Sequence, residues 1–206
     1  MPRRPAEGLK EVIRDFRREQ IIETARRLFG ERGSTDVAME EIAAEAGVAR
    51  STLYVYFANR DELLRACVQN MYDRLQDAVS VAADPRATPR QSLSALILGL
   101  LERIDESPAF FRLAMATQST GAEGSAAVGG ALMLIGLDMM RVLEQLVVAG
   151  VASGDFRPDL DTERAVVLVG QQIYGALSVR AGEPDPVPAR QAAEEISAFV
   201  HQGLGV

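Results

Sequence analysis

The chain has few of the residues on which catalysis, metal binding or covalent cross-linking depends. Among its 206 residues there is no Trp, one cysteine (Cys67) and one histidine (His201). A lone cysteine cannot form an internal disulfide and suits a reducing cytoplasm, and one Cys with one His cannot supply a zinc cluster. The isolated histidine leaves no Ser-His-Asp set, and no P-loop or dinucleotide fingerprint occurs. We therefore expect that the protein is not an enzyme and that it binds neither a cofactor nor a metal ion.

Long apolar runs are also missing. No stretch approaches the roughly 18 uninterrupted apolar residues of a membrane span, and the basic start of the chain has no apolar run behind it, as a secretory signal would. β-Branched residues are sparse, whereas Ala, Leu, Glu and Arg are frequent, which favours helices. The composition predicts an all-α protein with no membrane partner.

The charge is unevenly distributed along the chain. The net charge is −7, with 11 Lys and Arg against 10 Asp and Glu in residues 1–60, and 11 against 19 in residues 61–206. The first 18 residues contain six basic and three acidic side chains. An acidic body repels phosphates at long range, so any binding to DNA has to be local and well placed.

Apolar residues at helical spacing, interrupted by Pro- and Gly-rich breaks, predict about nine helices and no strand. Residues 1–16 either extend the first helix or form a mobile basic arm. A Gly- and Ser-rich run at 119–130 reads as a flexible separator. The expected helices cover about 17–32, 39–46, 50–57, 60–83, 90–106, 108–118, 126–151, 161–181 and 188–203.

The most informative segment is AMEEIAAEAGVARSTLYVYF, residues 38–57. Two short helices that cross steeply need a small side chain at the crossing, which Ala43 supplies. Gly47 can adopt positive φ in the turn between them, and Leu53 can fill the angle. This spacing fits a helix-turn-helix.

From about Arg17 to Val68, the motifs IIETARRLFGERG, IAAEAGV and STLYVYFANRDELL resemble the N-terminal domain of the TetR family of regulators. The resemblance covers roughly a quarter of the chain. It implies a three-helix, helix-turn-helix DNA-binding domain with an N-terminal arm (1–62) and a larger helical ligand-binding and dimerisation domain (63–206).

The resemblance puts helix 50–57 in the major groove of DNA. Arginine can read guanine, and hydroxyl groups bind phosphate. Ala38 and Ala49 stand where many members have a polar capping residue, and each loses a cap hydrogen bond worth about 1 kcal/mol. The basic arm can compensate through phosphate or minor-groove contacts. The DNA contacts implied by position are Arg50, Ser51, Thr52, Tyr54, Tyr56, Asn59 and Arg60.

The same resemblance implies an apolar effector cavity and a four-helix dimer interface. Methionines and aromatics beyond residue 70 can line such a cavity or belong to an ordinary core. The candidate cavity residues are Phe110, Phe111, Met115, Met133, Met140, Gln171 and Tyr174. Apolar stripes on the last two helices suit a partner subunit: Val166, Val169, Gly170, Ile173, Leu177, Ile196, Phe199 and Val200.

These expectations describe a cytoplasmic homodimeric repressor that a small, largely apolar ligand releases from a palindromic operator in double-stranded DNA. Activation, or a ligand acting as co-repressor, is the second possibility within this class. An alternative is a helical ligand- or partner-binding protein that has lost DNA recognition, which Ala38, Ala49 and the acidic charge support. Another alternative is a helical enzyme, but the sequence contains no candidate cluster of acid, base and nucleophile side chains.

Overall fold

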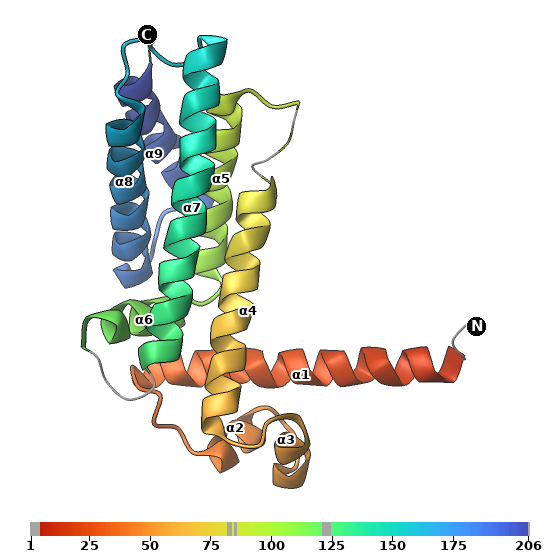
Figure 1. Ribbon diagram of the computed structural model, residues 1–206. Helices are drawn as coiled ribbons and strands as arrows, with labels where there is room; N and C mark the ends of the chain where they lie inside the picture. The colour runs from red at the N-terminus through yellow and green to blue at the C-terminus, as the bar shows by residue number, and fades with distance from the viewer. Residues whose placement is uncertain (1–4, 82–83, 85, 121–124, 206) are drawn as a thin grey trace.

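A computed structural model describes residues 5–81, 84, 86–120 and 125–205, and the regular elements within these ranges are all helices (Figure 1). Their bounds agree with the expected ranges to within about two residues, apart from the first helix. The helices are α1 (Pro5–Arg32), α2 (Met39–Glu45), α3 (Arg50–Tyr56), α4 (Arg60–Val81), α5 (Pro89–Asp105), α6 (Pro108–Thr120), α7 (Ser125–Ser153), α8 (Thr162–Gly182) and α9 (Ala189–Leu204).

Two stretches differ from the simplest expectation. Residues 5–16 extend α1 as a helix, which decides between the two alternatives for that part of the N-terminal segment. The separator expected at 119–130 is largely helical, because α6 ends at Thr120 and α7 begins at Ser125. The intervening residues 121–124 lie outside the described part of the chain.

The helices form a long bundle with a small helical unit at one end. This end unit consists of α1, α2, α3 and the start of α4. Helices α4, α5, α7, α8 and α9 run along the length of the bundle, α1 crosses its base, and α2 and α3 lie beyond α1 at the extremity opposite the C-terminus (Figure 1). Helix α4 extends from this extremity into the bundle, so it contacts both parts. None of the described helices has the length and apolarity that crossing a membrane requires.

The apolar faces of α1, α2, α3 and α4 meet in the core of the end unit. Ile21, Phe29, Ile42 and Leu53 are fully buried there. Cys67 of α4 is buried with them, and its Sγ lies 3.6 Å from the Ile22 carbonyl oxygen. Burial raises the pKa of the Cys67 thiol to about 12, so the thiol stays protonated and unreactive.

Candidate nucleic-acid interface

Helices α2 and α3 form the bent pair that the sequence predicts. Gly47 has φ +65° in the connecting turn, which is the conformation expected of it. The turn is closed by backbone hydrogen bonds from Gly47 N to Ala44 O (3.1 Å) and from Val48 N to Ala43 O (3.0 Å). Ala43 is 2% exposed, so a larger side chain there would have to displace its neighbours in the core.

Helix α3 buries one side chain fully and two partly, and presents the others to solvent. Leu53 is its only buried residue. Arg50, Ser51 and Tyr54 are exposed, and Thr52 and Tyr56 are half-buried. Because α3 lies at the extremity of the molecule, this polar surface is open to a large partner (Figure 1).

Two of the predicted DNA-contacting arginines have acidic partners in the free protein. Arg50 Nη2 lies 2.7 Å from Glu40 Oε1, and its guanidinium carbon lies 5.6 Å from the centre of the Tyr54 ring. Arg60 Nη1 lies 2.6 Å from Asp36 Oδ1. Neither carboxylate could be predicted as a partner from the sequence, because these pairs form between separate elements and have no helical spacing.

The helix ends confirm the capping expectations. Ala38 and Ala49 have extended backbones suited to an N-cap (ψ 139° and 146°) but make no side-chain cap hydrogen bond. Asn59, in contrast, accepts a hydrogen bond through Oδ1 from Glu62 N at 2.9 Å, and Glu62 Oε2 accepts one from Ala58 N at 2.8 Å. The start of α4 is therefore reciprocally capped, whereas α2 and α3 start with bare backbone donors.

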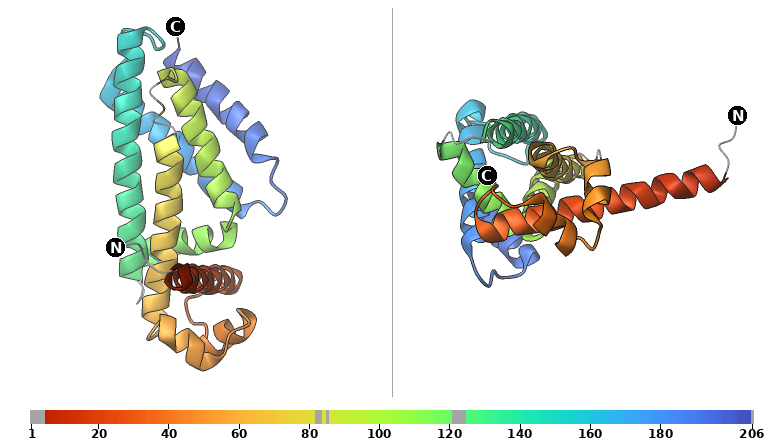
Figure 2. Two further views of the ribbon diagram at one scale, coloured as in Figure 1. Left: turned by 90° about the vertical axis from the view of Figure 1, so that its right-hand side faces the viewer. Right: turned by 90° about the horizontal axis from the view of Figure 1, so that it is seen from below.

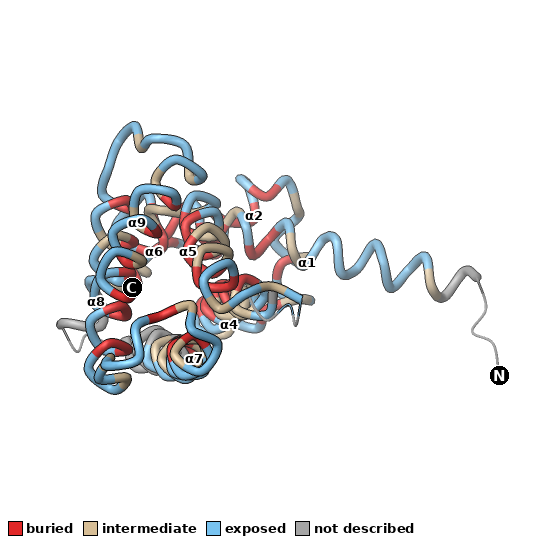
Figure 3. Tube along the Cα trace, turned by 90° about the horizontal axis from the view of Figure 1, so that it is seen from above, coloured by how far each residue is buried: buried red, intermediate tan, exposed pale blue. Residues whose placement is uncertain are grey.

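The N-terminal part of α1 projects from the molecule as an isolated helix (Figure 2), and nearly all of it is exposed (Figure 3). Among the described residues, Lys10, Arg14 and Arg17 make no ion pair, so their charges are available to a partner. Arg18 lies over the Phe57 ring at 5.4 Å, which ties the base of this segment to the end of α3. One face carries exposed apolar side chains: Leu9, Val12, Ile13 and Phe16.

The predicted dimer stripe requires a correction. Six of its eight residues are buried within the protomer, Ile196 is half-buried, and only Phe199 is strongly exposed, at 64%. Helix α8 is apolar around most of its circumference, so helical spacing alone could not distinguish the face packed on the bundle from a face left for a partner. The buried residues are Val166, Val169, Gly170, Ile173, Leu177 and Val200.

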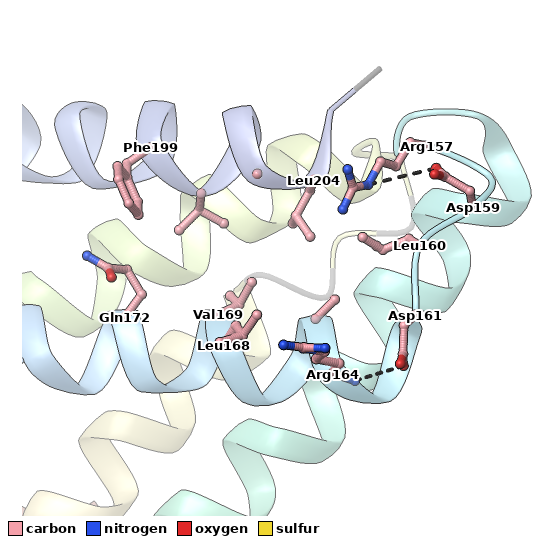
Figure 4. A pocket seen from close by; sticks show the side chains of 13 residues that line it. Arg157, Asp159, Leu160, Asp161, Arg164, Leu168, Val169, Gln172, Phe199 and Leu204 are labelled. Carbon is pink, nitrogen blue, oxygen red and sulfur yellow. Dashed lines mark hydrogen bonds and ion pairs between the residues drawn. The ribbon is translucent and has the colours of Figure 1, made fainter.

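Other sides of α8 carry exposed apolar side chains, with Leu168 and Val179 on one face and Tyr174 to the side of it. Leu168 is 60% exposed, Val179 63% and Tyr174 44%. A groove of about 550 Å³ lies between this face and α9, with Leu168 and Phe199 on its walls and the guanidinium groups of Arg157 and Arg164 at one end (Figure 4).

The predicted effector residues do not surround one cavity among the described residues. Phe110 and Phe111 are buried beside a cavity of about 10 Å³, the size of one water molecule. Met115 and Met140 are half-buried, while Met133, Gln171 and Tyr174 are exposed. Phe110 and Phe111 are therefore packed as ordinary core residues.

Comparison with known proteins finds a family match within the end unit. Residues 21–67 match the family described as "Bacterial regulatory proteins, tetR family". The HTH-type transcriptional regulator BetI of Rhizobium meliloti (strain 1021) is 36% identical over 93 residues, which are 45% of this chain and 44% of BetI. The chain thus matches less than half of the length of this relative.

Similarity in structure extends over nearly the whole chain. The ketosteroid transcriptional regulator KstR2 of Mycobacterium tuberculosis aligns with a TM-score of 0.70 and 24% identity, covering 92% of this chain and 95% of KstR2. The transcriptional regulator FadR of Bacillus subtilis, in complex with stearoyl-CoA, aligns with a TM-score of 0.64 and 19% identity, covering 90% and 98%. At these identities the likeness establishes the fold.

Proposed function

From the membership of this chain in the TetR family of bacterial regulatory proteins, we propose that it is a DNA-binding transcriptional repressor, released from a palindromic operator by a small ligand. The observation that carries the proposal is the construction of α3. A helix that buries only Leu53 fully, with Tyr56 partly packed on the core, offers Arg50, Ser51 and Tyr54 to solvent at the extremity of the molecule. A helix so exposed fits the major groove of B-DNA, which is about 12 Å wide.

On binding, DNA competes with the internal carboxylates for the arginines. Arg50 exchanges Glu40 for a base edge or phosphate, and Arg60 exchanges Asp36. Both pairs are solvent-exposed, so their separation costs little, about 1 kcal/mol or less each. Until then, Glu40 and the Tyr54 ring keep the Arg50 side chain extended along the exposed side of α3.

The projecting part of α1 adds phosphate contacts beyond α3. Lys10, Arg14 and Arg17 supply this positive charge on a chain whose net charge is −7. The double variant Arg14→Gln/Arg17→Gln should bind the operator more weakly, and the slope of log K against log salt should fall by about 2 if each residue neutralises one phosphate. An unchanged slope would rule out these contacts.

Repression by this mechanism needs a homodimer. The exposed apolar face of α8 and α9, which includes Leu168, Val179 and Phe199, can pair with its copy across a two-fold axis. Two α3 helices about 34–36 Å apart then meet successive major grooves of a palindromic site. This face replaces the buried stripe as the proposed interface.

The proposed effector is a largely apolar molecule bound in the helical body. Support comes from the structural neighbour FadR, which is in complex with stearoyl-CoA. Because α4 runs from the end unit into the body, a ligand that favours one position of α4 changes the spacing of the two α3 helices. Operator affinity then falls by the ratio of the ligand's affinities for the two arrangements.

A second candidate is a helical ligand- or partner-binding protein without specific DNA binding. Three observations favour it: α2 and α3 begin without side-chain caps, Glu40 and Asp36 neutralise two of the predicted DNA contacts, and the chain is acidic.

Fluorescence anisotropy with duplexes covering the DNA that flanks the gene, at low salt, separates the two candidates. We expect specific binding by the wild type and a loss of at least about tenfold for Arg50→Ala and Tyr54→Ala. Arg190→Ala, which removes one exposed positive charge from α9 in the bundle, is the matched control and should bind nearly as the wild type. Absence of specific binding by the wild type would favour the second candidate.

A further inference from the structure

Helix α1 is in direct backbone contact with the body of the protein. A Cβ atom placed on Gly30 would lie 2.6 Å from Phe110 N and 2.7 Å from Ala109 C, both in the first turn of α6. No side chain fits between the two helices at this point. Since α1 also packs on α2 and α4, its position at α6 determines where the end unit sits relative to the bundle.

Beside this contact, Arg74 of α4 connects α1 with the end of α5. Its Nη2 lies 3.0 Å from Glu19 Oε1 and 3.7 Å from Glu23 Oε2, both on α1. Its Nη1 donates to Glu106, which follows the last residue of α5. The side chains of Arg74 and Glu106 are only 28% and 27% exposed, so solvent screens this pair less than an ordinary surface ion pair.

A second set of hydrogen bonds fixes the α1 carboxylate that Arg74 binds. Asn70 Nδ2 donates to Glu19 Oε1 at 2.9 Å, and Asn70 Oδ1 accepts from Arg26 Nη1 at 2.6 Å. Arg26 is 3% exposed, so the Asn70 amide is held on a buried group. Glu19 therefore has little freedom to follow Arg74 elsewhere, and the bridge has a defined geometry.

Loss of Arg74 would leave three carboxylates around its site: Glu19 and Glu23 on α1 and Glu106 beyond α5. Glu106 would retain Arg103, whose Nη1 lies 2.7 Å from Glu106 Oε1. Arg26, whose charge interacts with both Glu23 and Glu106, would remain nearby. Among the described residues, however, no side chain with an ion pair on each side would be left, so the attraction between α1 and the corner between α5 and α6 would weaken.

We propose that Arg74 is a positioning residue for DNA binding: by joining Glu19 of α1 to Glu106, it fixes the angle of the end unit on the body. In the dimer this angle determines the separation of the two α3 helices. The inference rests on the proposed function, because only a DNA-binding dimer makes this separation matter. Its effect on the protein's own geometry, however, can be measured without DNA.

The first test uses two spin labels on the free protein, at Val55→Cys of α3 and Gln145→Cys of α7, both exposed positions; Cys67 is buried and stays unlabelled. We expect Arg74→Gln to broaden and shift the distance distribution measured by pulsed electron resonance. Arg103→Gln is the matched control, since it removes a pair to the same Glu106 without reaching α1 and should leave the distribution unchanged. An unchanged distribution for Arg74→Gln would overturn the positioning role.

The second test uses an operator selected from random duplexes with the wild-type protein, and the same operator with one base pair inserted between its half-sites. Arg74→Gln should bind the selected operator about tenfold more weakly while losing much less on the lengthened one. An equal loss on both duplexes would indicate lowered stability alone and contradict the inference. If the wild type selects no duplex, the proposed function fails, and the label distances still decide the role of Arg74.

Discussion

The sequence predicts a DNA-contacting surface on α3 and a dimer interface that includes α8. The predicted residues are exposed on α3 but buried on α8. Helix α3 exposes the predicted Arg50, Ser51 and Tyr54. Helix α8 buries the residues chosen for a partner, among them Val169 and Ile173. The difference lies in how much of each helix is packed, because α3 fully buries only Leu53, whereas one side of the largely apolar α8 is packed on the bundle.

A seven-residue helix at the extremity of the molecule packs only one side on its neighbours, so most of its polar residues face solvent. A long helix that is apolar all round has several equivalent ways to pack. For such a helix, the identity of its neighbours decides which face becomes core and which remains available to a partner.

The largest expected effect separates the two faces of α8. Ile173→Asp would place a charge at a position that is 2% exposed and should cost at least about 4 kcal/mol, enough to prevent folding. Leu168→Asp, on the 60% exposed face, should fold normally and sediment as a monomer. Circular dichroism and sedimentation velocity measure the two outcomes. A dimeric Leu168→Asp protein would move the proposed interface away from this face.

The single anchor of α3 is tested by Leu53→Ala, which removes the only buried side chain of that helix. We expect a loss of about 3 kcal/mol in the end unit and loss of DNA binding. Val55→Ala is the control, because Val55 is 81% exposed and its truncation should change stability by less than about 0.5 kcal/mol. Hydrogen exchange of residues 39–57 reports the local effect; equal protection in both variants would contradict the one-anchor description.

A smaller effect concerns how these helices begin. Ala49→Ser would add a cap to α3, whose N-cap backbone is already extended, and should stabilise the end unit by about 1 kcal/mol. Thr88→Ala in the body should do the reverse, because Thr88 Oγ1 accepts from Gln91 N in a complete capping box. Chemical denaturation of the two variants measures both changes. No gain from Ala49→Ser would indicate that DNA-binding geometry, not stability, limits this position.

The smallest effect concerns pH and lies in the body, where His201 Nε2 is 2.9 Å from Ser94 Oγ. Burial, and then the nearby Arg90, lower the pKa of His201. The folded protein thus prefers the neutral ring, and unfolding takes up a proton below the ordinary pKa of about 6.5. Stability should be complete above that pH and decline as pH falls toward the folded pKa. Melting temperatures between about pH 7.5 and 5.5 should show this decline in the wild type and a flatter curve in His201→Gln.

Prediction from the sequence succeeded where one local rule had a single solution. Gly47 adopts the expected positive φ, and the expected bare ends at Ala38 and Ala49 are present. These local features also explain why α3, the second helix of the bent pair, faces solvent. The boundary between domains at residues 62 and 63 stays a prediction, because α4 runs without a break through that position.

Contacts between separate elements could not be predicted in the same way. The pairs of Arg50 with Glu40 and of Arg60 with Asp36, and the position of Phe110 beside a cavity of one water rather than a ligand, depend on how helices approach each other. No helical period encodes these approaches.

The order of the helices, the bounds of all but the first, the bent pair at residues 39–56 and its polar surface were determined by the sequence, since each depends on residues within a few positions of one another. The burial of one face of α8 and the bridge of Arg74 between α1 and α5 were decided only by the tertiary structure. Their partners are far apart along the chain, and only packing brings them together.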